Sequence, residues 1–177
     1  MKFSLKIAKK VIFRLGLLLF ILGLLIPQNL IIPVEGATYN DYHADTFWYY
    51  PWGTSVTHKG VDIFAKSGTP VLAATAGLVI YSGKLGKGGK VLMVLGPKWR
   101  IHYYAHLKTA HVEKYGWVNG GTPIGEVGTS GNAFGKPAHL HYTLLTLIPY
   151  PWRIDEDRQG WKKMFILNPI DYWRLEN

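Results

Sequence analysis

Three short pieces of sequence that carry histidine and aspartate, each set among glycines and β-forming residues, constrain this chain more than any other feature. They are His58–Asp62, Tyr104–Leu107 and His139–Tyr142. A catalytic zinc ion usually takes three protein ligands and leaves the fourth position for water. Hydrolysis at such an ion also needs a proton acceptor and a group that stabilises developing negative charge. Together the three pieces contain enough residues of these types for a hydrolytic zinc site.

The spacing within two of these pieces sets geometric conditions. Side chains alternate between the faces of a strand, so His139 and His141 point the same way if extended, with Cα atoms roughly 6.6 Å apart. His58 and Asp62 would lie about 13 Å apart in an extended chain. That separation is too large for two ligand bonds of about 2 Å to one ion. The segment must therefore bend if both residues bind the metal, and Gly60 tolerates a bend.

The other histidines, His43, His102 and His111, stand outside these pairs. A lone histidine is more often a packed or surface residue than a ligand, so we expect no role for them in the site. Residues 100–106 are predicted to form a strand. Regular alternation along it places His102, Tyr104 and His106 on one face, which would make His102 a neighbour of the site.

Further motifs accompany the histidine pieces in a specific order. They are Gly68–Val71, Ala76–Val79, Ile124–Gly125 and Gly128–Asn132. With these motifs the chain resembles the lysostaphin-type zinc metallopeptidases, which cut peptide bonds in bacterial cell-wall peptidoglycan. The resemblance runs from about His58 to Tyr142, roughly half of the chain.

The resemblance implies a role for each site residue. It implies that His58, Asp62 and His141 bind Zn²⁺ and that His106 and His139 form the catalytic pair beside the metal. Which of these two is the general base stays open, as do the residues that bind substrate. Relatives often continue the last motif with an aromatic residue and glutamate, whereas threonine stands at position 143 here. This departure affects local substrate contacts and leaves the metal ligands intact.

The resemblance also implies the substrate class and an alternative. The substrate would be a peptide cross-bridge or stem peptide of peptidoglycan, with the particular bond left open. The alternative is a non-catalytic domain of the same fold that binds the cell wall or activates other wall hydrolases. All five site positions are present in this chain, which favours a zinc metalloendopeptidase.

The N-terminal region predicts export. Five basic residues precede an apolar stretch, Leu15–Ile26, of twelve residues. A basic flank followed by a short apolar run is typical of an export signal, whereas a membrane-spanning helix needs about twenty residues. Apolar character continues in residues 11–34, so a retained membrane anchor and a cleaved signal both stay open. We expect residues 1–36 to be the signal peptide or anchor, and residues 37–177 to be the metallopeptidase domain on the periplasmic or extracellular side.

Charge and cysteine content exclude several classes of function. The formal net charge is +9, and outside residues 1–36 fifteen cations face ten acids, which leaves +5. This excess favours contact with anionic wall polymers or lipids. No basic helix or aromatic RNA-binding signature accompanies it, so nucleic acid is not expected as a partner. The absence of cysteine excludes a thiolate zinc site and disulfide bonds. The oligomeric state is not indicated.

The expected fold is all-β, or β-dominated: a small antiparallel sheet domain with a substrate groove, preceded by a hydrophobic leader helix. Residues 71–74, 77–81 and 90–95 are rich in β-forming residues and bounded by glycine or proline. The basic loop at residues 83–90 matches no phosphate-loop pattern, and we expect a hairpin loop at the groove rim. The aromatic segment at residues 36–52 either packs on the domain edge or forms a groove wall. The glycine-rich loop at residues 128–137 should border the site, because loops on rigid sheets often carry binding residues.

Overall fold

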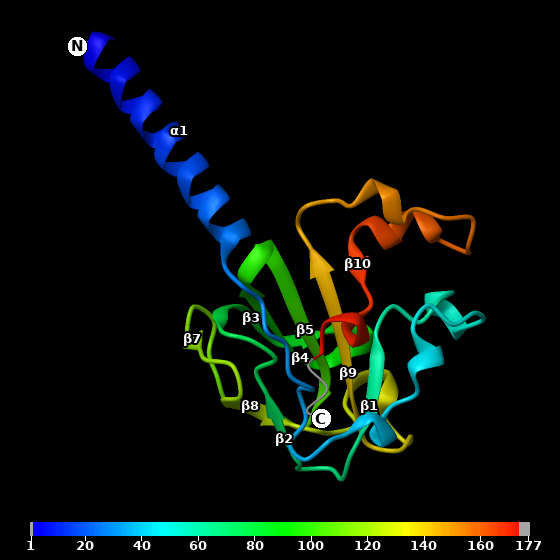
Figure 1. The fold of residues 1–177 in the computed structure, drawn as a ribbon. Helices are drawn as coiled ribbons and strands as arrows, with labels where there is room; N and C mark the ends of the chain where they lie inside the picture. The colour runs from blue at the N-terminus through cyan, green and yellow to red at the C-terminus, as the bar shows by residue number, and fades with distance from the viewer. Residues whose placement is uncertain (1, 174–177) are drawn as a thin grey trace.

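The computed structural model describes residues 2–173, which form a β-dominated domain with one long helix at its N-terminal end (Figure 1). The helix is α1 (Lys2–Leu25). The strands are β1 (Val61–Phe64), β2 (Pro70–Leu72), β3 (Gly77–Leu85), β4 (Gly89–Gly96), β5 (Arg100–Leu107), β6 (Thr109–Ala110), β7 (Trp117–Val118), β8 (Pro123–Glu126), β9 (His139–Thr146) and β10 (Ile166–Leu167). Short 3-10 helices in the connections are η1 (Tyr39–Asp41), η2 (Ala44–Thr46), η3 (Gly53–Ser55), η4 (Gly86–Gly88), η5 (Pro97–Trp99), η6 (Gly131–Ala133), η7 (Pro151–Arg153), η8 (Gly160–Met164) and η9 (Pro169–Tyr172). The expected β-dominated fold class with a leading helix is confirmed.

Two antiparallel sheets make up the domain. The larger sheet has seven strands, in the order β1-β9-β5-β4-β3-β7, with β10 also pairing with β9. The smaller sheet has three strands, in the order β2-β8-β6. The long central strands β3, β4, β5 and β9 are rich in β-branched, aromatic and other apolar residues, which favour a pleated and partly buried surface.

Alternation along β9 separates the core from the opposite face of the large sheet. Leu140, Tyr142 and Leu144 are fully buried and belong to a core cluster that also contains residues of the small sheet. His139 and His141, which alternate with these core residues, line a groove. The expected common orientation of these two histidines is therefore confirmed, because the strand is regular at this point.

An irregularity in β5 decides where His106 lies. Lys90 pairs with Leu107 and Leu92 pairs with Tyr104, so β5 carries one residue more than the facing part of β4. At this bulge His106 has a left-handed backbone conformation, with φ 64°. Tyr104 lies in the core, whereas His106 lines the groove. The expected common face of these two residues is wrong, because the extra residue of a bulge re-aims the side chain beside it.

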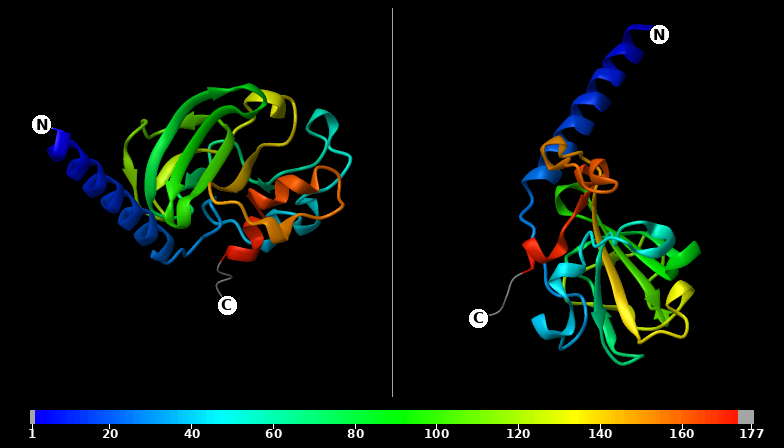
Figure 2. Two further views of the ribbon diagram at one scale, coloured as in Figure 1. Left: turned by 90° about the horizontal axis from the view of Figure 1, so that it is seen from above. Right: turned by 90° about the vertical axis from the view of Figure 1, so that its right-hand side faces the viewer.

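Helix α1 projects away from the sheets in all three views (Figures 1 and 2). Near its C-terminal end the ring of Phe20 stacks on Trp99, with 5.9 Å between the ring centroids. The Trp99 indole Nε1–H also donates a hydrogen bond of 2.9 Å to the carbonyl of Phe20. Among the described residues, no helix combines the length and the apolar character needed to cross a membrane.

The chain that follows α1 is built into the domain. Leu30 and Val34 are 0% and 2% exposed and belong to the core cluster. The Ile31 N–H donates to the carbonyl of Ala74, and the Leu72 N–H donates to the carbonyl of Pro33. Residues 30–35 fall within the expected leader but pack as part of the sheet domain. The division of the chain at residue 36 stays a prediction.

Candidate metal centre and active-site groove

The pairing of β1 with β9 brings together two of the predicted ligands. Asp62 lies directly opposite His141 in the register, and Phe64 lies opposite His139. A Cβ atom on Gly60 would stand 2.9 Å from the His141 ring and 2.6 Å from the Tyr142 carbonyl. Gly60 is therefore needed for close approach of the β1 entry to β9, in addition to the bend for which it was predicted.

His58 reaches the same place from the loop before β1. Its backbone is held by two hydrogen bonds, from the Trp48 N–H to the His58 carbonyl and from the His58 N–H to the Tyr49 carbonyl. Its side chain is 1% exposed, and its ring stacks on Trp52 with 4.2 Å between centroids. His58 Nε2 is 3.1 Å from Asp62 Oδ1. The expected bend between His58 and Asp62 is therefore present.

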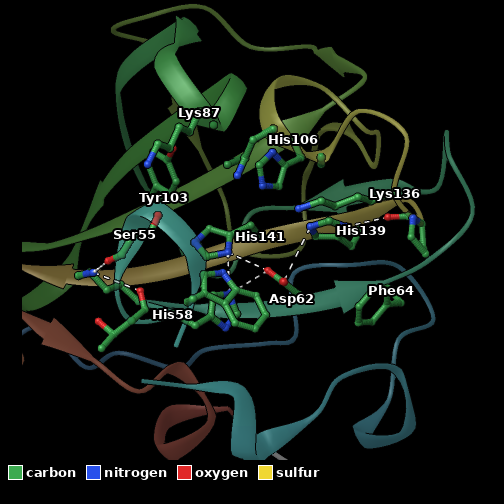
Figure 3. A pocket seen from close by; sticks show the side chains of 18 residues that line it. Ser55, His58, Asp62, Phe64, Lys87, Tyr103, His106, Lys136, His139 and His141 are labelled. Carbon is green, nitrogen blue, oxygen red and sulfur yellow. Dashed lines mark hydrogen bonds and ion pairs between the residues drawn. The ribbon is translucent and has the colours of Figure 1, made fainter. Parts of the chain in front are cut away.

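Three ligand atoms converge on one point (Figure 3). His58 Nε2 is 3.1 Å from His141 Nδ1, and His141 Nδ1 is 2.7 Å from Asp62 Oδ1. Ligands of a tetrahedral zinc ion at 2.0–2.1 Å lie about 3.3 Å from one another. Among the described residues, His58, Asp62 and His141 form the group of side chains that could hold a metal ion. Two imidazoles and a carboxylate are donors that zinc accepts, so the residues present fit the ion.

The second ring nitrogen of each ligand histidine has an oxygen partner. His58 Nδ1 lies 2.9 Å from the Thr46 carbonyl, and because a carbonyl only accepts, Nδ1 carries the proton. His141 Nε2 lies 3.1 Å from Thr143 Oγ1. When His141 Nδ1 offers its lone pair to a metal, Nε2 holds the proton and donates it to Thr143. Such partners fix the tautomer and orientation of a ligand imidazole.

Thr143 is a residue whose role the sequence did not reveal. Strand alternation places it on the same face as His141, but the pattern carries no sign of a contact between them. Its side chain is buried, with 6% exposed. The departure from the related motif at this position therefore bears on the orientation of a ligand, in addition to the substrate contacts that we expected it to affect.

His106 and His139 lie beside the ligand group with matched tautomers. His106 Nδ1 donates to the Ser130 carbonyl at 2.9 Å, and His139 Nδ1 donates to the Pro137 carbonyl at 2.8 Å. Their ring centroids are 5.0 Å apart. With the single proton of a neutral imidazole on Nδ1, Nε2 is left as a lone-pair acceptor in each ring. The two groups can therefore accept a proton from the same small molecule.

Burial and charge define the protonation states at the site. Burial and the neighbouring His141 lower the pKa of His106 to about 4, so its imidazole is neutral at pH 7. Burial raises the pKa of Asp62, but the neighbouring His141 and His58 rings outweigh this and hold the pKa well below its usual range. Burial also lowers the pKa of His141. Neutral imidazoles and an ionised carboxylate are the forms that bind metal.

These residues line a groove of about 560 Å³. Trp52 of the aromatic segment forms part of its wall, whereas Trp48 is buried, so this segment serves both of the roles expected for it. The basic hairpin loop supplies Lys87, and the glycine-rich loop before β9 supplies Lys136. Both loops therefore lie at the groove, as expected.

The remaining histidines lie outside the groove lining. His43 is exposed, and His111 is 3.7 Å from a carboxylate oxygen of Glu126. His102 is fully buried, and its Nδ1 is 2.6 Å from the hydroxyl of the core residue Tyr142. His102 is therefore a core residue on the opposite face of β5, and the expectation that it adjoins the site is wrong.

The chain is similar to known peptidases. In Neisseria meningitidis serogroup B, the DD-carboxypeptidase/endopeptidase Mpg is 39% identical over 85 residues, which cover 48% of this chain and 19% of that protein. The glycyl-glycine endopeptidase ALE-1 of Staphylococcus capitis is 32% identical over 100 residues, or 55% of this chain and 27% of that protein. The chain thus matches less than a third of the length of these relatives. The catalytic domain of the antimicrobial peptidase lysostaphin from Staphylococcus simulans aligns with a TM-score of 0.57 and 25% identity, over 70% of this chain and 84% of that one.

A family model identifies the segment that carries the site. The model of peptidase family M23 matches residues 56–148, just over half of the chain. The matched segment contains all five predicted site residues and the strands β1 to β9. The chain therefore belongs to peptidase family M23.

Proposed function

We propose that this chain is a zinc-dependent endopeptidase that hydrolyses peptide bonds in bacterial peptidoglycan. The observation that carries the proposal is the convergence of His58, Asp62 and His141 next to His106 and His139 in an open groove. Membership in a peptidase family and similarity to endopeptidases support the reaction class.

His58, Asp62 and His141 would hold the metal. A zinc ion with three protein ligands lowers the pKa of its water to about 7 and polarises the scissile carbonyl. The Thr46 carbonyl and Thr143 Oγ1 keep both ligand rings in the orientation in which their lone pairs face Asp62. The ligands are thus preorganised, which reduces the reorganisation needed on binding.

His139 and His106 would handle the protons. Their Nε2 atoms are both acceptors, and a ring-centroid separation of 5.0 Å allows one water to donate a hydrogen bond to each. Burial lowers the pKa of His106 and so weakens it as a base. We assign the first proton transfer to His139, which lies on the same strand face as His141, and the orientation of the water to His106. The proton on His139 would then pass to the leaving amine.

The decisive experiment uses the full chain, purified in mild detergent and loaded with zinc. It is incubated with purified peptidoglycan, and the soluble fragments are identified by mass. We expect fragments with new amino and carboxyl ends, loss of cleavage with a chelator, and recovery with added zinc. The matched control is His141→Ala. Stoichiometric zinc without any new peptide ends would contradict the enzyme and favour a non-catalytic domain that binds the wall or activates other hydrolases.

We also propose that the domain acts outside the cytoplasmic membrane. The basic residues before Leu15–Ile26 support this orientation, because such flanks stay on the cytoplasmic side. A reporter that is active only in the cytoplasm, fused after Asn177, should give no signal. A bright signal from an intact fusion would contradict the orientation.

A further inference from the structure

Three lysines stand around the groove without carboxylate partners among residues 2–173. Lys59, Lys87 and Lys136 belong to its lining. Among the lining residues described, Asp62 is the carboxylate, and it is engaged by His58 and His141. The lysines that form ion pairs in the described part of the chain are Lys108 and Lys163, both outside the groove.

The lysines come from separate loops and lie on different sides of the ligand group. Lys87 lies in η4 of the β3–β4 hairpin, beside Tyr103 and Ser55 (Figure 3). Lys136 lies in the loop before β9, next to His139 and on the side toward Phe64. His141 lies between these two ends of the groove in the same view.

Lys59 adds a second positive charge at the Lys87 end. Its ammonium donates to the carbonyls of Ser55 and Thr57, at 2.7 and 3.2 Å. Lys59 is half-buried and lines the groove together with Lys87. An unpaired, partly buried cation is costly without an anionic partner, and a groove walled by one sign of charge concentrates the opposite sign.

We propose that the groove binds acidic peptides, with free carboxylates on both sides of the scissile bond, in preference to uncharged glycine bridges. This assignment rests on the proposed endopeptidase function and names its substrate class. Lys136 would contact a carboxylate at the His139 end, and Lys59 and Lys87 would contact one at the other end. Peptidoglycan stem peptides carry such carboxylates, whereas a glycine cross-bridge has no charged side chain.

Equilibrium binding tests the assignment independently of cleavage. Three peptides of equal length are compared by calorimetry on the full chain: an acidic peptide, the same peptide with its carboxylates converted to amides, and a glycine peptide. We expect the acidic peptide to bind about tenfold or more tightly than the other two, with the difference shrinking as salt is added.

The variants Lys59→Gln, Lys87→Gln and Lys136→Gln should each weaken binding of the acidic peptide about 2–5-fold and leave the amidated peptide unchanged. The matched control is Lys114→Gln, an exposed lysine outside the groove lining. In a cleavage assay, we expect the lysine variants to raise KM with little change in kcat.

The outcomes separate this inference from the proposed function. Equal binding of acidic and amidated peptides would overturn the inference even if peptidoglycan is cleaved. A variant that combines Lys59→Gln, Lys87→Gln and Lys136→Gln should lose the preference for the acidic peptide. If the preference persists in this variant, the inference is wrong, because groups other than the lysines then recognise the carboxylates. Lysine-dependent binding of the acidic peptide by a chain that cuts neither peptide nor peptidoglycan would support the inference and contradict the endopeptidase.

Discussion

At the scale of single residues, the four histidines of the groove share one arrangement. In each ring, one nitrogen has an oxygen partner, and the other is free to bind a metal or to accept a proton. The oxygens belong to Thr46, Thr143, Ser130 and Pro137. Because the oxygen partner selects the tautomer, the difference between a ligand and a proton acceptor comes from where the free nitrogen points. Free nitrogens of two histidines face the Asp62 carboxylate at hydrogen-bond distance.

The first prediction separates ligands from proton-handling residues. We expect His141→Ala to lose zinc and activity, because two remaining donors hold the ion poorly. His106→Ala and His139→Ala should keep zinc and lose activity about 10²–10⁴-fold, the usual contribution of an acid or base. Zinc content and peptidoglycan cleavage are measured on the same preparations. If His139→Ala strips zinc as fully as His141→Ala, the roles of the two residues are wrongly assigned.

The second prediction concerns Thr143. Thr143→Val keeps the shape of this buried side chain but removes the oxygen that accepts from His141 Nε2. Loss of such a partner typically weakens metal affinity about 10–100-fold. The affinity is measured by competition with a chelator of known strength, with Thr143→Ser as the control that keeps the hydroxyl. Equal affinity of the valine variant and the parent would show that Thr143 does not orient the ligand.

At the scale of elements, two strands place histidines in the groove in different ways: β9 by regular alternation and β5 by a bulge. Regular alternation lets β9 present histidines to the groove and Leu140, Tyr142 and Leu144 to the core. In β5, a bulge interrupts alternation so that His106 joins the groove one residue after Ala105, which also lines it. A regular β5 would direct neighbouring residues to opposite faces. The placement of His106 beside His139 therefore depends on the bulge as much as on the two histidines.

The segment after α1 also acts as an element of the domain, and the third prediction tests this. Leu30 is fully buried in the core cluster. We expect Leu30→Ala to lower the free energy of unfolding by about 2–5 kcal/mol. Ile12→Ala, at an exposed position of α1, should change it by less than about 0.5 kcal/mol. Both are measured by denaturant unfolding of the full chain. Similar small effects for both variants would mean that residues 30–35 are not part of the folded unit.

At the scale of the whole molecule, a series of hydrogen-bonded polar side chains connects the segment after α1 to strand β9, which carries His139 and His141. Gln28 Nε2 is 3.1 Å from His102 Nε2, and His102 Nδ1 is 2.6 Å from the Tyr142 hydroxyl. The Arg100 guanidinium donates to Gln28 Oε1. Tyr142 directly follows His141 in β9, so the contact links the chain after α1 to the strand position next to a predicted metal ligand.

The fourth prediction follows from the burial of His102. Burial, with the charge of Arg100, lowers its pKa from 6.5 to about 3. Between these values the unfolded chain binds a proton that the folded protein does not. Stability contributed by His102 is therefore complete above pH 6.5 and declines as pH falls, by up to about 1.4 kcal/mol per pH unit.

Denaturant unfolding from pH 7 to 4.5, with a chelator present so that metal release does not contribute, measures this effect. We expect His102→Gln to flatten the acid-side fall in the free energy of unfolding relative to the parent. His43→Gln, an exposed histidine, should keep the parental slope. A parental slope in the His102 variant would mean that other groups cause the acid sensitivity.

Local pattern by itself determined the β-dominated class, the shared face of His139 and His141 and the need for a bend at Gly60. These features depend on backbone periodicity over a few residues, which the sequence states directly. The five residues of the candidate site were named from their motifs and resemblance, and the structure brings His58, Asp62 and His141 within ligand distance. Their metal-binding and catalytic roles stay predictions.

Only the tertiary structure decided the features that join distant parts of the chain. His58 and His141 are 83 residues apart in sequence, and their contact depends on the pairing of β1 with β9. The bulge at His106 arises from the register between β4 and β5, which no pattern within β5 specifies. The burial of Leu30 likewise requires a partner from elsewhere, because its apolar neighbours made it look like part of a leader. The register between strands and the approach of the His58 loop to β9 are set by packing between segments that are remote in sequence. The periodicity of one segment therefore cannot predict them.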